Sequence, residues 1–167
     1  MNRHLTRTLA MQIIYEWDFR DRKNLKEIQN RSEEIFKKDL DIEYLRKLVN
    51  GTIKELDQVD KKILSVAPEF PIDQIAKIDK AILRIAIFEF ENCQEVPPKV
   101  IINEAVEIAK MFGGENSYKF VNGALGAIYR SSSRFEQDTK IEPKKTNPKG
   151  KPAAKKKISE DRIKIKE

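Results

Sequence analysis

Apolar residues recur every three or four positions along most of residues 1–131, which is the period of an amphipathic α-helix. One such set is Leu5, Leu9, Ile13 and Trp17. No segment alternates apolar and polar residues for long enough to predict a β-strand. The pattern therefore predicts an all-α protein of six or seven helices. The expected helices cover residues 5–19, 25–36, 41–63, 75–90, 100–112 and 117–128.

The segment 75–90 has a different pattern, because it is apolar on most sides rather than on one stripe. A helix of this kind lies at the centre of a bundle or beneath an interface. Prolines bound the segment, with Pro68 and Pro71 before it and Pro97 and Pro98 after it. Since proline lacks a backbone N–H and crowds the preceding turn, we expect the neighbouring helices to end there.

Glycines suggest two further features of the last two helices. Gly113 and Gly114 follow the helix 100–112, where a glycine in the left-handed conformation commonly closes a helix. Gly123 and Gly126 lie inside the final helical pattern. Because glycine weakens a helix, its presence there predicts a close approach of two helices.

Charge is distributed unevenly along the chain. The net charge of the 167 residues is +6, but residues 134–167 hold 12 of the 33 basic and 6 of the 27 acidic residues. Residues 1–133 are therefore neutral, with 21 of each sign, and the pI is weak evidence for nucleic-acid binding by this part. The tail has few large apolar residues, so we expect a helical domain over 1–133 and a disordered Lys-rich tail over 134–167.

Catalytic and metal-binding chemistry finds little support in the composition. His4 is the single histidine and Cys93 the single cysteine, which excludes an intramolecular disulfide and a structural zinc site built from Cys and His. Glu104 and Glu107 are expected on a solvated helix face. With no signal-peptide pattern and no long apolar run, we expect a cytoplasmic, non-membrane, non-enzymatic protein without cofactors.

The first helix begins with a local excess of positive charge. Between Met1 and Tyr15 the chain carries Arg3, His4 and Arg7 and no acidic residue. Such a patch on a neutral domain can contact nucleic-acid phosphates, although both arginines could equally be ordinary solvated side chains.

A second candidate region lies between residues 110 and 120, where aromatic residues alternate with lysines and amides. Unstacked bases need ring faces and hydrogen-bonding groups of this kind. Phe112 and Tyr118 also fit the inward stripe and could be core, whereas Phe120 lies off that stripe and is the better RNA candidate. The candidate residues are Lys110, Phe112, Asn116, Lys119 and Phe120.

Three stretches of the chain resemble the bacterial transcription antitermination factor NusB family. They are RTLAMQIIY at 7–15, DKAILRIAIFEF at 79–90 and VPPKVIINEAVEIAKMFGGENSYKFVNGAL at 96–125. The third stretch is long and specific. The resemblance spans about residues 3–130 and leaves out the basic tail.

The resemblance implies a compact bundle of about seven helices in two packed sub-bundles. It also implies binding to boxA RNA of ribosomal RNA leader transcripts, as a heterodimer with the small-subunit ribosomal protein NusE. The complex then joins RNA polymerase with other Nus factors.

The resemblance also suggests roles for individual residues. Arg7 and the basic start of the first helix would contact RNA phosphates, and Phe112, Asn116, Lys119 and Phe120 would lie along the same RNA track. Tyr15 and Asp79 would lie at the partner-binding side. Asp79 stands where the family leads us to expect glutamate, and Asn116 where an acid is possible.

Two alternative functions remain open at this point. A similar helical module precedes a methyltransferase domain in some bacterial enzymes, but no Gly-rich cofactor loop follows Ser131 here. A helical bundle that binds only proteins is the other alternative, and an RNA titration would distinguish it.

Overall fold

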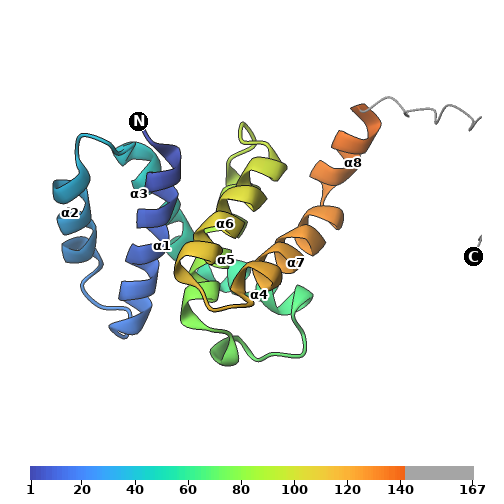
Figure 1. Ribbon diagram of the computed structural model, residues 1–167, viewed down its shortest axis with the longest axis horizontal. Coiled ribbons are helices and arrows are strands. Elements are labelled where there is room, and N and C mark those ends of the chain that lie inside the picture. The colour runs from blue at the N-terminus through green and yellow to red at the C-terminus, as the bar shows by residue number, and fades with distance from the viewer. Residues whose placement is uncertain (142–167) are drawn as a thin grey trace, which may run out of the picture.

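The computed structural model describes residues 1–141, which form eight α-helices and a short 3-10 helix with no strand (Figure 1). The predicted all-α fold is confirmed. Within the described part of the chain, no helix is long and apolar enough to cross a bilayer. The helices are α1 (Arg3–Phe19), α2 (Leu25–Phe36), α3 (Ile42–Lys54), α4 (Leu56–Val66), α5 (Lys77–Asn92), α6 (Pro98–Phe112), α7 (Ser117–Arg130) and α8 (Ser133–Ile141), with the 3-10 helix at Ile72–Gln74.

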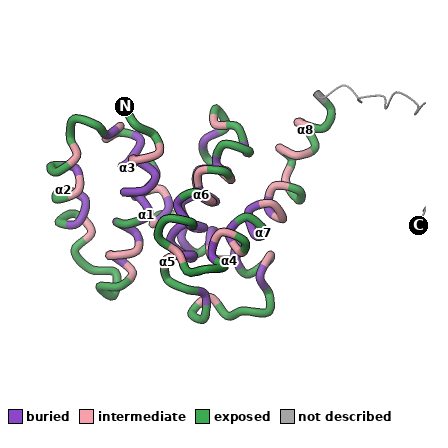
Figure 2. The backbone as a smooth tube through the Cα atoms, viewed as in Figure 1, coloured by how far each residue is buried: buried purple, intermediate pink, exposed green. Residues whose placement is uncertain are grey.

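Helix α5 lies at the centre, as its apolar pattern predicted. It packs against α1 and α3 on one side and against α4, α6 and α7 on the other. Every residue from 79 to 90 is buried, and Figure 2 shows this helix as the most continuously buried segment. The helices therefore form two groups, α1–α3 and α4–α7, which meet at α5.

Polar side chains cap the starts of two helices. The Asn2 side chain accepts a hydrogen bond from Leu5 N at 3.0 Å, and Asp41 accepts one from Tyr44 N at 3.1 Å. Each bond satisfies a backbone N–H that has no partner within the helix. These caps set the start of α1 and of α3.

The long helix expected over 41–63 is two helices. The chain leaves helical geometry at Glu55, whose φ and ψ are −103° and 19°, between α3 and α4. Both helices pack on α5, so the apolar stripe continues across the break. The spacing of apolar residues indicates which face of a helix is buried, but it does not show that the helix is interrupted at a single residue.

The glycine predictions hold only in part. Helix α6 does end at Gly113, but with φ and ψ of −84° and 178° rather than in the left-handed conformation. The close helix approach expected at Gly123 and Gly126 is absent. A Cβ on Gly123 would meet nothing within 4 Å, and one on Gly126 would approach only the Arg130 side chain of the same helix. The close approach is at Gly51 instead, where an added Cβ would lie 2.0 Å from the Phe88 ring. No described glycine has a positive φ. The described non-glycine residues with positive φ are Asp21, Arg22 and Asn24.

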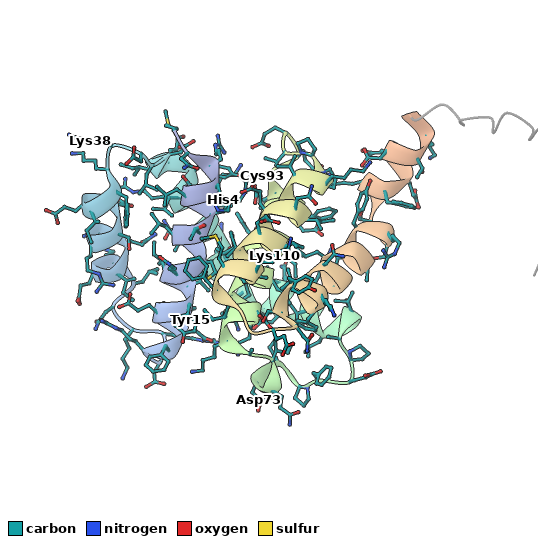
Figure 3. The ribbon with its side chains drawn as sticks, viewed as in Figure 1. His4, Tyr15, Lys38, Asp73, Cys93 and Lys110 are labelled. Atoms are coloured by element: carbon teal, nitrogen blue, oxygen red, sulfur yellow. The ribbon has the colours of Figure 1, made fainter. Side chains whose placement is uncertain are left out.

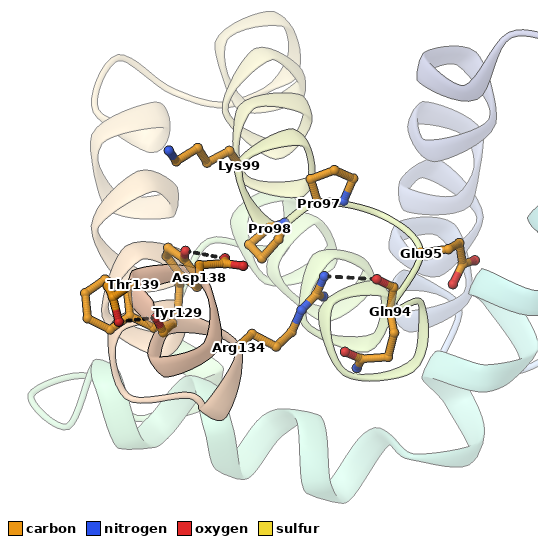
Figure 4. A pocket seen from close by; sticks show the side chains of 10 residues that line it. Gln94, Glu95, Pro97, Pro98, Lys99, Tyr129, Arg134, Asp138 and Thr139 are labelled. Carbon is orange, nitrogen blue, oxygen red and sulfur yellow. Dashed lines mark hydrogen bonds between the residues drawn. The ribbon is translucent and has the colours of Figure 1, made fainter. Parts of the chain in front are cut away.

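Helix α8 overturns the predicted boundary at residue 133, because residues 134–141 are helical rather than disordered. The Arg134 guanidinium donates to the carbonyl oxygens of Phe90 at 2.9 Å and Val96 at 2.6 Å, and Phe135 packs edge-on against Tyr129. A pocket lies between α8 and the turn that joins α5 to α6 (Figure 4). Hydrogen bonds from a side chain to backbone carbonyls produce no apolar pattern in the sequence, so the sequence did not predict that residues 134–141 are helical. The rest of the predicted tail, 142–167, lies outside the described residues.

Candidate nucleic-acid interface

The N-terminal end of α1 carries Arg3 and His4, and the side chain of each contacts an acidic residue outside α1. His4 Nδ1 lies 2.8 Å from Glu104 Oε2 on α6. Arg3 pairs with Asp41 at 3.1 Å, and its guanidinium carbon lies 3.7 Å from the centre of the Tyr44 ring. Figure 3 shows His4 on the side of α1 that faces α6. Arg3 and His4 both reach solvent, as a phosphate contact requires.

Arg7 has a different environment, because it is only 6% exposed. Its Nε donates to both carboxylate oxygens of Glu89, at 3.0 and 2.9 Å, and Glu89 is 1% exposed. Burial opposes the charge of Arg7, but the hydrogen bonds and charge of Glu89 outweigh it and raise the pKa of Arg7. The Tyr44 hydroxyl donates to the same carboxylate. Burial first, and this hydrogen bond second, raise the pKa of Tyr44 above its ordinary value.

The expected contact between Arg7 and RNA phosphates does not fit this placement. An arginine that is buried and paired in two places with a carboxylate has few donors left for a ligand. Arg7 therefore holds α1 against α5, and the exposed basic side chains at this end of α1 are Arg3 and His4.

The lysines of the second region flank one aromatic ring. Lys110 Nζ and Lys119 Nζ lie 5.9 and 5.8 Å from the centre of the Tyr118 ring. Lys110 also pairs with Glu107 one helical turn earlier, at 3.0 Å. The end of α6 and the start of α7 thus bring two lysines and one ring together.

The relative exposure of the aromatic residues differs from the prediction. Phe112 is 37% exposed, because α6 ends at this residue and its ring lies at the edge of the core. Phe120 is half-buried and packs against the core, and so does Tyr118. Asn116 is exposed just before α7, and its side chain makes no capping bond. Phe112, rather than Phe120, is the more accessible ring for a base.

Tyr15, predicted to bind the protein partner, lies near the C-terminal end of α1 (Figure 3). Its ring stacks on Phe19, with 6.3 Å between centroids and 20° between planes. Phe19 is largely exposed, and Lys77 Nζ lies 5.1 Å from its ring centre. A half-buried Tyr15 ring stacked on an exposed Phe19 ring beside a lysine is a suitable protein-binding surface.

Asp79, the other predicted partner contact, is buried in the first turn of α5 and only 7% exposed. Its Oδ1 has no hydrogen-bond partner among the described residues. Burial raises the pKa of this carboxyl, and a hydrogen bond with Ser117 opposes the rise only in part. Because Ser117 Oγ also accepts from Gly114 N at 2.8 Å, Asp79 lies directly beneath the α6–α7 loop.

The sequence did not predict that Glu104 and Glu107 contact the basic side chains of the candidate site. Glu107 and Lys110 are three residues apart, so helical spacing alone could have indicated their contact. His4 and Glu104 are a hundred residues apart, and only the packing of α1 on α6 brings them together.

Comparison with known proteins identifies the family. The sequence model of the NusB family matches residues 4–130. The transcription antitermination protein NusB of Roseiflexus castenholzii is 40% identical over 140 residues, which cover 83% of this chain and 96% of the relative. The chain belongs to the NusB family. A NusB protein of Colwellia psychrerythraea is 39% identical over 124 residues, covering 74% of this chain and 88% of that protein.

Solved NusB structures share the fold. T. maritima NusB superposes with a TM-score of 0.73 at 30% identity, covering 81% of this chain and 98% of that one. A chain from a structure of the antitermination factors NusB and NusE with double-stranded RNA has a TM-score of 0.67 at 27% identity, covering 79% of this chain and all of that one. Membership in the NusB family makes this chain a transcription antitermination factor and not an enzyme, as the sequence predicted.

Proposed function

We propose that this chain binds single-stranded boxA-type RNA of ribosomal RNA leader transcripts as a heterodimer with the small-subunit ribosomal protein NusE. The observation that carries the proposal is the likeness, over 79% of the chain, to a NusB structure that contains NusE and RNA. The heterodimer joins RNA polymerase with other Nus factors in the cytoplasm. Family membership and the accessible cations at α1 and α6–α7 support this assignment.

The RNA surface runs from the start of α1 to the end of α6 and the start of α7. Cations on this surface contact phosphates, and exposed rings stack on bases. Arg7 supports the surface from within the core and does not contact RNA itself. The proposed RNA-binding residues are Arg3, His4, Lys110, Phe112, Asn116, Lys119 and Phe120.

The partner surface lies at the other end of α1 and at the start of α5. Tyr15 and its stacked neighbour Phe19 supply the aromatic contact. Asp79 is buried and does not contact the partner directly. It supports the loop that carries the RNA-binding residues through its hydrogen bond with Ser117. The RNA and partner surfaces therefore meet near the α6–α7 loop.

Binding of labelled RNA tests the proposal. The intact chain should bind a boxA-like RNA weakly, because residues 1–133 are neutral overall and the proposed surface has only a few basic side chains, and the salt dependence should be shallow. Adding the ribosomal protein should tighten binding of boxA-like RNA more than binding of scrambled RNA. Equal affinity for the two RNAs, with and without the ribosomal protein, would refute the proposed function.

Residues 142–167 carry ten basic and four acidic residues. A Lys-rich segment raises general affinity for nucleic acid by counterion release and carries no base-reading geometry. We propose that this segment contributes only non-specific affinity. Removing it should weaken binding of boxA-like and scrambled RNA by a similar factor.

A further inference from the structure

Two carboxylates of α6 contact basic side chains of the proposed RNA surface. Glu104 contacts His4 at 2.8 Å, and Glu107 contacts Lys110 at 3.0 Å. Glu104 and Glu107 are three residues apart and therefore lie on neighbouring turns of one helix face. The surface that should attract phosphates is thus partly neutralised by acids of its own chain.

Glu104 occupies a position suited to a phosphate oxygen. Its Oε2 lies 2.8 Å from His4 Nδ1 and 3.6 Å from Arg7 Nη1, so one anionic oxygen sits between nitrogens of two side chains. Carboxylate and phosphate oxygens are bound by the same N–H donors at similar distances. The Glu104 side chain is 27% exposed and that of His4 39%, so an RNA phosphate can reach His4 Nδ1 once this carboxylate moves away.

We propose that Glu104 and Glu107 limit the RNA affinity of this chain by competing with phosphates for His4 and Lys110. The inference rests on the proposed function and concerns the strength of RNA binding at the same surface. Before a phosphate can bind, each acid must give up its ion pair and then lie near the incoming negative charge. Acids so placed lower affinity for every RNA, so that tight binding needs the further contacts supplied by the correct sequence and the partner.

Neutralising single acids in the intact chain tests this. Glu104→Gln and Glu107→Gln each remove one negative charge and keep the side chain's size. The matched control is Glu91→Gln, because Glu91 forms a comparable exposed ion pair with Lys62 at the far end of α5 from Asp79. All three variants change the net charge equally, so only local competition distinguishes them.

The two α6 variants should bind boxA-like RNA about twofold to fivefold more tightly, the factor that corresponds to one exposed ion pair. Their salt dependence should steepen by about 0.7 in log–log slope, the value for one additional phosphate contact with a single strand. Glu91→Gln should change neither quantity by a comparable amount. Adding His4→Gln to Glu104→Gln should abolish the gain, because the released donor is then missing.

Other results overturn the inference. If the intact chain binds boxA-like RNA but Glu104→Gln and Glu107→Gln behave like Glu91→Gln, the acids do not compete with RNA. If Glu104→Gln lowers the melting temperature, its effect on RNA binding cannot be separated from its effect on the fold. Glu107→Gln then tests the inference by itself, because its ion pair with Lys110 lies on the surface. If the unaltered chain binds neither RNA, with or without the ribosomal protein, the proposed function itself fails and the inference fails with it.

Discussion

Replacing Arg7 with alanine should destabilise the fold, whatever it does to RNA binding. The substitution removes a guanidinium that pairs with Glu89, a carboxylate that is 1% exposed and keeps only the Tyr44 hydroxyl as a partner. Removing one member of a buried ion pair costs about 3–5 kcal/mol, because the other charge stays buried without compensation. One kcal/mol corresponds to about 3–5 °C for a domain of this size, so the melting temperature should fall by about 9–25 °C.

Thermal and urea unfolding followed by circular dichroism measure this effect. Arg3→Ala is the matched control, because Arg3 forms an exposed ion pair and its removal should cost about 1 kcal/mol or less. The double variant Arg7→Met with Glu89→Gln should recover much of the loss, since no buried charge then lacks a partner. An Arg7→Ala chain that unfolds like the unaltered chain, yet loses RNA affinity, would show that Arg7 contacts phosphate and that the buried-pair argument is wrong.

Three further substitutions test other parts of the structure. Gly51→Ala should lower the free energy of unfolding by about 1–3 kcal/mol, because the added Cβ would overlap the Phe88 ring. Gly123→Ala should raise it by up to about 1 kcal/mol, because the added Cβ would meet no other atom. Equal shifts in the urea midpoint of the two variants would contradict this. The raised pKa of Asp79 means that ionising this carboxyl costs stability as pH rises from the unfolded value of about 3.9 through the folded value. Asp79→Asn should therefore melt higher than the unaltered chain at pH 7 and equally at pH 3, and a lower melting temperature at pH 7 would refute this. Phe112→Ala should weaken RNA binding by about 1–3 kcal/mol with little change in melting temperature, whereas Phe120→Ala should lower both; a Phe112→Ala chain that loses only stability would contradict the assignment.

The sequence predicted the elements whose burial repeats with the helical period. The central position of α5 follows from a segment that is apolar on most sides. The break at Glu55 and the ordering of α8 escaped prediction. A bend between two helices on the same core leaves the apolar stripe intact, and Arg134 anchors α8 through backbone carbonyls rather than apolar contacts.

The candidate site was harder to predict than the fold, because its charges are paired over long distances in sequence. An arginine in a basic stretch can be a surface contact or one half of a buried ion pair, and both have the same local pattern. The partner of Arg7 is 82 residues away, and only the packing of α1 on α5 distinguishes the two cases. The sequence also predicted that Phe120 is more accessible than Phe112, whereas the reverse holds. Helical spacing places Phe112 on the inward stripe but does not show that α6 ends at this residue.

Two ion pairs fix where α1 lies on α5, and they do so near opposite ends of α1. Arg7 pairs with Glu89 near the start of α1, and Asp18 lies 3.3 Å from Arg84 near its end. Burial opposes the charge of Asp18, but Arg84 outweighs it and lowers the pKa of Asp18. A shift of α1 by one turn would leave Glu89 buried without its arginine and move Asp18 away from Arg84, which opposes sliding more strongly than interchangeable apolar contacts would.

This placement has a consequence for binding, because α1 carries residues of both proposed surfaces. Arg3 and His4 precede Arg7 by one helical turn, and Tyr15 precedes Asp18 by one turn. Each ion pair thus lies one turn from the exposed side chains of one surface. The buried charges of α5 therefore fix where both ends of α1 lie relative to α5, and apolar packing alone would define that position less sharply.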